Sequence, residues 1–194
     1  VPTILRRSEH MSFAALSTGG GSADYLAYKA QENPHWRVDG ESAEITKFLL
    51  DYDSLKTGWQ KLAAGEAPHN VWAEVPGTTI PRPSEDHRQA FLLWVYLKQE
   101  YGSTADGWRE WSSSQTTARI GLEKIGADLD AGAKKNKGKA AVIEIEGYES
   151  VKLGAGTHQV PKFKLTGWAK KPANVVAEPE PEPVAGEPED ANVF

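Results

Sequence analysis

Three segments of the sequence alternate aromatic and basic side chains in the manner of a two-sided β-strand. The segment 91–98 reads FLLWVYLK. Its first, third, fifth and seventh residues are apolar, whereas Trp94, Tyr96 and Lys98 belong to the other alternate set. Successive side chains of a strand point to opposite faces, so one face is predicted to be core and the other to carry two rings and a cation. Rings stack on nucleobases and cations follow phosphates, which predicts a surface for single-stranded nucleic acid.

The other two segments follow the same pattern. We expect Trp59 and Lys61 to share one face of the strand predicted at 55–62. We expect Lys162, Lys164 and Trp168 to share one face of the last strand. A single tryptophan of this kind could equally be a core residue, so the hypothesis depends on the combination. The predicted nucleic-acid-binding residues are Trp59, Lys61, Trp94, Tyr96, Lys98, Arg109, Trp111, Lys162, Lys164 and Trp168.

Signatures of catalysis or metal binding are missing from the sequence. None of the five histidines is spaced with another histidine or a carboxylate as a zinc motif requires, and no G-x-S-x-G motif occurs. The glycine-rich stretch TGGGSA is not followed by Lys-Ser or Lys-Thr, so it reads as a linker rather than a phosphate-binding loop. We therefore predict a protein without catalytic residues, metal or cofactor.

Strands dominate the expected elements. We predict strands at 44–52, 55–62, 71–75, 87–99, 106–115, 140–153 and 160–168. Asp53 and Ser54 suit a tight turn between the first two. The apolar residues of 116–131 recur with helical spacing, which predicts one helix with Gly132 as its C-cap residue. A further short helix is expected around 23–31.

This order predicts a mainly β fold, an OB-fold-like five-stranded barrel with a helix between its third and fourth strands. An α+β sandwich would give a similar order of elements. We expect residues 1–40 to form an N-terminal arm, 41–172 the OB-like nucleic-acid-binding domain, and 173–194 a disordered acidic tail.

The charge of the chain is unevenly distributed. The segment 173–194 contains six acidic residues and no lysine or arginine, so the net charge of −5 divides into −6 for this segment and +1 for the remainder. A tethered anion of this kind is expected to compete with nucleic acid for a basic groove. The sequence has no cysteine, no apolar run long enough to span a membrane and no signal peptide, so we expect a cytoplasmic protein without membrane partners.

The C-terminal sequence EPEPEPVAGEPEDANVF resembles the tails of single-stranded DNA-binding proteins, those of phages in particular. Both the bacterial and the phage families pair an OB-fold with an acidic tail that ends in or near phenylalanine. The resemblance implies that the tail recruits replication, recombination or repair proteins. The corresponding partner-binding residues are Glu187, Glu189, Asp190 and Phe194.

Two other classes of function fit parts of the pattern. In a phage structural or assembly protein, the tryptophan-rich faces would be subunit interfaces and the tail a solubilising extension. In a carbohydrate-binding β-domain, the rings would stack on sugars. The leading hypothesis is sequence-nonspecific binding of single-stranded DNA, by a chain whose composition also allows a homo-oligomer.

Overall fold

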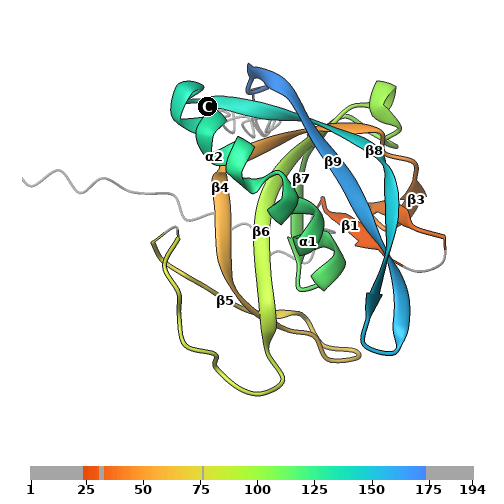
Figure 1. The fold of residues 1–194 in the computed structure, drawn as a ribbon, viewed down its shortest axis with the longest axis vertical. Helices are drawn as coiled ribbons and strands as arrows, with labels where there is room; N and C mark the ends of the chain where they lie inside the picture. The colour runs from red at the N-terminus through yellow and green to blue at the C-terminus, as the bar shows by residue number, and fades with distance from the viewer. Residues whose placement is uncertain (1–23, 31–32, 76, 174–194) are drawn as a thin grey trace, which may run out of the picture.

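The computed structural model describes residues 24–30, 33–75 and 77–173, which form two antiparallel sheets and two α-helices (Figure 1). The prediction of a mainly β protein is therefore confirmed. The smaller sheet contains β1 (Leu26–Lys29), β2 (His35–Val38) and β3 (Glu41–Ala43). The larger sheet contains β4 (Lys47–Lys61), β5 (His69–Trp72), β6 (Arg88–Leu97), β7 (Gly107–Ser113), β8 (Lys139–Leu153) and β9 (Gly156–Lys170). A 3₁₀ turn (Gln99–Tyr101) follows β6, and α1 (Thr116–Lys124) and α2 (Gly126–Lys135) connect β7 to β8.

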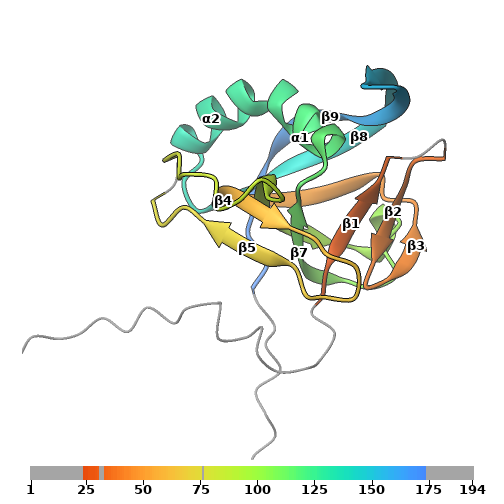
Figure 2. The ribbon, with the colours of Figure 1, turned by 90° about the horizontal axis from the view of Figure 1, so that it is seen from below.

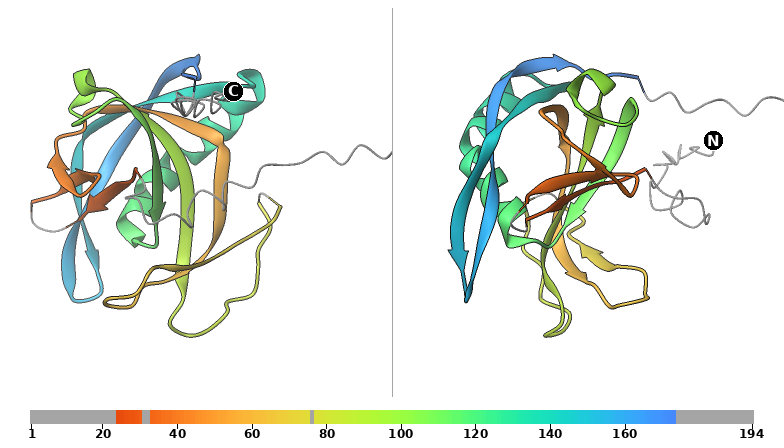
Figure 3. Two further views of the ribbon diagram at one scale, coloured as in Figure 1. Left: turned by 180° about the vertical axis from the view of Figure 1, so that it is seen from behind. Right: turned by 90° about the vertical axis from the view of Figure 1, so that its right-hand side faces the viewer.

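Strand β4 lies at the centre of the larger sheet, whose order is β7-β6-β4-β8-β9. The first part of β4 pairs with β8 and β6, and its last part pairs with β6 and β5. The sheet curves so that β8 and β9 lie on one side of the molecule and β6 and β7 on the other (Figure 3). Among the described residues, β7 and β9 at the two ends of this order do not pair, so the sheet does not close into a barrel.

The core lies inside the curve of the sheet. Phe91, Leu93, Val95 and Leu97 of β6 all belong to it, which confirms the core face predicted from the alternation in 91–98. Rings contributed by both sheets pack edge to face at its centre. These rings belong to Trp36, Phe48, Phe91, Trp111 and Phe163.

The turn predicted at Asp53 and Ser54 is wrong, because β4 runs continuously through this point with a bulge between Asp51 and Lys56. Ser54 Oγ donates to the Asp51 carbonyl oxygen over 2.6 Å and accepts the backbone N–H of Trp94 over 2.8 Å. A bulge leaves backbone groups unpaired. The serine side chain satisfies two of them, and the strand continues.

The N-terminal arm predicted for residues 1–40 is wrong for residues 24–30 and 33–40, because β1 and β2 contribute to the core; residues 1–23 lie outside the described residues. The helix expected around 23–31 is also wrong, because Leu26 and Tyr28 alternate inward from β1 and Trp36 is completely buried. Asp39 and Gly40, both with positive φ, form the two-residue turn of the β2–β3 hairpin.

The smaller sheet connects the two ends of the larger one. Tyr25 forms a parallel bridge with Glu110 of β7. At the other side, the Ala30 carbonyl accepts the backbone N–H of Gln159, and the Tyr28 hydroxyl donates to the Gln159 carbonyl in β9. The opening between β7 and β9 is thus bridged by β1 rather than by direct pairing.

The predicted helix 116–131 is divided into α1 and α2 at Ile125, and α2 continues beyond Gly132. Gly132 is therefore not a C-cap residue. A Cβ atom at this position would lie 2.6 Å from the ring of Trp168, so glycine here permits the close approach of β9 to α2.

Candidate nucleic-acid interface

Three rings gather on the face of β6 and β7 that points away from the core. Trp94 and Tyr96 alternate with the core residues of β6, and Trp108 lies opposite Tyr96 on β7. The rings of Tyr96 and Trp108 are 5.4 Å apart and nearly perpendicular. All three side chains are half-buried. We call Trp94, Tyr96 and Trp108 the aromatic face.

Trp108 was not predicted as a binding residue, although the sequence contains a signal for it. Residues three apart in a strand lie on opposite faces, so Trp108 and Trp111 in GWREW must be separated by the sheet. The register of β6 and β7 places Trp108 on the side of Tyr96, a choice between the two tryptophans that the sequence alone does not make.

Basic side chains border the aromatic face. Lys98 follows β6 directly after Tyr96 and Leu97, and its Nζ lies 3.1 Å from Glu100 and 5.5 Å from the centre of the Tyr101 ring. Lys56, which is exposed, lies opposite Leu92 in the middle of β6, two residues before Trp94. Cations thus lie before Trp94 and after Tyr96 along β6.

Residues 171–172 lie across this same face. Lys171 Nζ contacts the carboxylates of Asp51 and Asp53 on β4 at 2.6 and 2.9 Å. Burial lowers the pKa of Lys171, but its hydrogen bonds to these two carboxylates outweigh burial and raise it. The next residue, Pro172, accepts a hydrogen bond from Trp108 Nε1 over 3.3 Å. The described chain therefore leads from β9 over β4 to the aromatic face.

Acidic residues lie on both sides of Trp94, with Asp51 opposite it on β4 and Glu110 opposite it on β7. Glu110 has a shifted pKa. Burial raises its pKa, and the nearby Lys56 only partly offsets this effect. A carboxyl group with a raised pKa in the folded state binds its proton more tightly when folded. Its ionisation therefore destabilises the fold as pH rises through the unfolded-state value, and the cost is complete above the folded-state value.

Replacing Glu110 with glutamine should consequently raise the free energy of unfolding at pH 7. The gain should shrink as pH falls below the ordinary glutamate value of about 4.5, where the wild-type carboxyl is protonated in both states. Urea unfolding of wild type and Glu110→Gln at pH 7 and pH 3.5 measures the difference. Glu85→Gln, at an exposed loop position, is the control. Equal gains at both pH values would contradict the assignment of the effect to ionisation.

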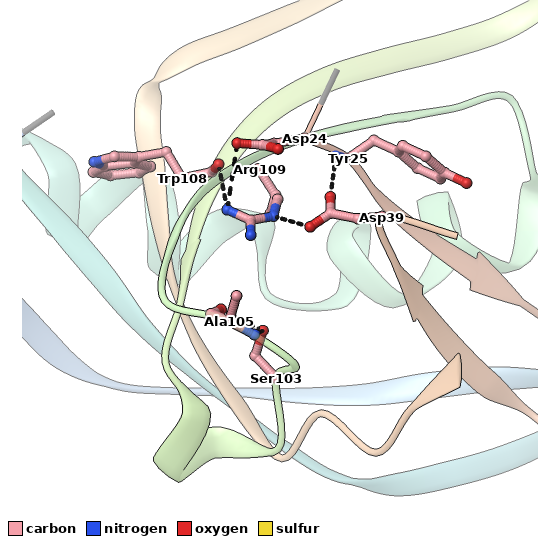
Figure 4. Close-up of polar contacts among 7 residues, drawn as sticks. All are labelled: Asp24, Tyr25, Asp39, Ser103, Ala105, Trp108 and Arg109. Carbon is pink, nitrogen blue, oxygen red and sulfur yellow. Dashed lines mark hydrogen bonds and ion pairs between the residues drawn. The ribbon is translucent and has the colours of Figure 1, made fainter. Parts of the chain in front are cut away.

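Two of the predicted binding residues are instead buried in the core side of β7. Trp111 is 0% exposed and packs among the central rings. Arg109 is 5% exposed, and its guanidinium contacts Asp39 at 2.9 Å and Asp24 at 3.8 Å (Figure 4). It also donates to the Trp108 carbonyl. The prediction of a nucleic-acid contact is wrong for both residues, because Arg109 anchors the β2–β3 turn to β7 and Trp111 fills the core.

Trp168 does not lie on the face predicted for it. β9 has a register irregularity opposite Val142 and Ile143, and this shifts Trp168 to the inner side, where it packs against the core and Gly132. A bulge reverses the alternation on which the prediction rested. Lys162 and Lys164 do point outward, as predicted, and are exposed.

The predicted lysines of β9 are far from the aromatic face in strand order. β8 and β4 separate β9 from β6. Glu146 of β8 contacts Lys164 at 2.8 Å, and the hydrogen bond raises the pKa of Lys164. The three segments therefore do not form one continuous ring-and-lysine surface.

Trp59 and Lys61 belong to a different surface at the end of β4. Trp59 Nε1 donates to the Ile80 carbonyl over 2.9 Å, and the guanidinium of Arg82 lies 5.7 Å from its ring centre. Lys61 pairs with Asp86 at 3.1 Å. The loop between β5 and β6 thus holds both side chains.

The tail residues Glu187, Glu189, Asp190 and Phe194 lie outside the described residues. Within the described ranges, no group of three or more His, Asp or Glu side chains is placed to hold a metal ion, and no helix has the length and apolarity of a membrane span. Comparison with known proteins found no matching family model, no matching curated protein and no matching solved structure.

Proposed function

We propose that this protein binds single-stranded DNA without sequence preference, through the aromatic face of β6 and β7. The observation that carries the proposal is the cluster of Trp94, Tyr96 and Trp108 on the outward side of two adjacent strands, bordered by lysines. These three rings are not required to fill the core, because the core contains other rings on the opposite side of the same strands.

The energetics of single-strand binding suit this surface. Each base stacked on an aromatic side chain contributes roughly 1–3 kcal/mol, and every base offers a π-face, which makes the contact tolerant of sequence. Lys56 and Lys98 add contacts with phosphate whose strength falls as salt rises. Two or three stacked bases with flanking phosphates would give affinity well above that of charge alone.

The arrangement of strands supports the proposal further. We infer that the fold is an open variant of the OB-fold, since the principal strands β4, β6, β7, β8 and β9 follow its order and α1 and α2 lie between the third and fourth. OB-folds are partly open barrels that bind oligonucleotides on the face of their second and third strands. In this chain those strands are β6 and β7, which carry the aromatic face.

The acidic segment is proposed to regulate the same face and to recruit replication or recombination proteins. The chain enters this segment from Lys171 and Pro172, which already contact β4 and Trp108. Six carboxylates tethered at that point would raise the local concentration of negative charge beside the rings.

Deletion of residues 178–194 should therefore leave the affinity for oligo-dT equal or higher. The gain should be larger at low salt, where the competing charges are least screened. Fluorescence anisotropy with labelled dT oligonucleotide measures it, and a tail in which the six acids are replaced by their amides is the length-matched control. A large loss of affinity in either variant would contradict competition.

The proposed function is tested by titrating the full chain with labelled oligo-dT at low and high salt, with duplex of equal length as competitor. Tight binding that weakens with salt and resists duplex competition is the expected result. Absence of binding, with self-assembly in analytical ultracentrifugation, would instead favour a structural protein whose rings form subunit interfaces.

A further inference from the structure

A pocket of about 360 Å³ lies on the other side of the sheet from the aromatic face. Its walls are the inward residues of β4 and β6, the facing sides of α1 and α2, and the loop residues 78–80. Figures 1 and 2 show α1 and α2 running alongside these strands. It exists because β8 pairs only with the first part of β4, so the helices rather than a strand cover the remainder.

The pocket combines flat apolar walls with a few hydrogen-bonding groups. Its apolar wall includes the rings of Tyr52, Trp59 and Phe91 together with Leu122 and Leu129. Burial and the hydrogen bond to Asp130 raise the pKa of Tyr52 to about 12, so its ring remains an uncharged phenol at neutral pH. This lining is typical of sites for small organic ligands.

One donor in the wall is incompletely satisfied. Arg119 donates through Nη1 to Gln89 over 2.9 Å, and its Nε lies 3.3 Å from the Glu123 carboxylate. This Nε is buried and makes no hydrogen bond of acceptable geometry among the described residues. Buried donors are rarely left without an acceptor, so the position suits a ligand that brings one.

Charge favours a ligand whose buried part is neutral. Arg119 is paired with Glu123, and Arg82 beside Trp59 is balanced by Asp130, which accepts a hydrogen bond from Tyr52 in the wall. Burying a charge without a partner is costly, so an uncharged group suits this site.

We propose that this pocket binds a single nucleotide, with its base between the rings and the helices. A nucleobase is planar, is uncharged at neutral pH and carries carbonyl oxygens that can accept from Arg119. The volume is near the lower limit of about 300 Å³ for ligand pockets, which suits one base with its sugar and excludes a stacked run of bases. This site is distinct from the aromatic face, because it lies on the opposite side of the sheet. The nucleotide could be free or part of a bound strand.

The test introduces a side chain into the pocket at Gly126, the first residue of α2. A Cβ atom there would have no neighbour within 4 Å, so Gly126→Leu should place its side chain in the pocket without displacing the wall. Ala127→Leu adds the same side chain to the next, exposed position as the matched control. Thr57→Leu fills the pocket from the opposite, exposed wall and serves if Gly126→Leu does not fold.

Thymidine monophosphate is the probe, observed by saturation-transfer NMR, with ribose 5-phosphate as a ligand that lacks the base. Wild type and Ala127→Leu should bind thymidine monophosphate and not ribose 5-phosphate, and Gly126→Leu should bind at least tenfold more weakly. Equal binding by both folded pocket variants and wild type, or no binding by wild type, would overturn the proposal.

Two further comparisons separate this site from the proposed function. Trp94→Ala should lose affinity for oligo-dT and keep binding of the mononucleotide. If Gly126→Leu also weakens oligo-dT binding, the pocket takes a base of the bound strand, whereas unchanged oligo-dT binding identifies a site for free nucleotide. If the wild-type chain binds thymidine monophosphate but not oligo-dT, the proposed function is wrong and the nucleotide site in the pocket is supported.

Discussion

Replacement of Trp111 with alanine is expected to lower the free energy of unfolding by about 3–5 kcal/mol, the usual cost of removing a large ring from a packed core. Trp111 is completely buried, with ring centres 5.2 Å from Trp36 and 5.0 Å from Phe91. Few surrounding groups could collapse into the space, since the neighbours are themselves rings of both sheets. Urea unfolding monitored by far-UV circular dichroism measures the loss.

Trp111→Phe provides the matched control. The indole Nε1 of Trp111 is buried without a hydrogen-bond partner among the described residues, so phenylalanine removes an unsatisfied donor while keeping most of the ring. Its cost should be much smaller than that of alanine. A stable Trp111→Ala protein with reduced oligo-dT affinity would contradict the core assignment and restore Trp111 to the interface.

The second large effect is expected at the aromatic face. Trp94→Ala or Trp108→Ala should weaken oligo-dT binding about 5- to 150-fold, which corresponds to one stacked base at roughly 1–3 kcal/mol. The double variant should lose more than either single variant if both rings stack on bases. Because these side chains lie outside the central ring cluster, the thermal midpoint should change far less than in Trp111→Ala.

Trp72→Ala is the control for this experiment, because Trp72 is also half-buried in a strand but lies on β5. Its affinity for oligo-dT should match that of wild type. Equal losses in Trp72→Ala and Trp94→Ala would indicate a nonspecific effect of removing tryptophan. Unchanged affinity in both single variants and the double variant would exclude the aromatic face as the interface.

The sequence predicted β6 well because its alternation has no interruption. Phe91, Leu93 and Val95 entered the core as expected, and Trp94 and Tyr96 lie opposite them. A period of two identifies faces only while the register holds. This is why the same reasoning succeeded for 91–97.

The predictions fail where the register of a strand changes, or where the sequence does not show which face of a strand is buried. The irregularity near Val142 moved Trp168 inward, and the bulge after Asp51 kept β4 continuous where a turn was expected. Neither feature has a reliable sequence signal. Which alternate face of β7 was buried also depended on packing against Trp36, from a segment expected to lie outside the domain.

A local signal for that segment was nevertheless present. Asp39-Gly40 follows the apolar residue Val38, and an Asp-Gly pair between two strands is a strong indicator of a two-residue hairpin. It would have predicted the β2–β3 hairpin and placed Trp36 on a strand. The ion pair of Asp39 with Arg109, which explains why Arg109 is buried, could not be predicted, because the two residues are 70 positions apart.

Photocrosslinking maps the proposed interface most directly. The full chain would be irradiated with oligo-dT containing 5-iododeoxyuridine, and the crosslinked peptides identified by mass spectrometry. Our account predicts crosslinks at Trp94, Tyr96 and Trp108, on β6 and β7. Efficient crosslinking confined to other strands, with none on β6 or β7, would contradict the assignment of DNA binding to the aromatic face.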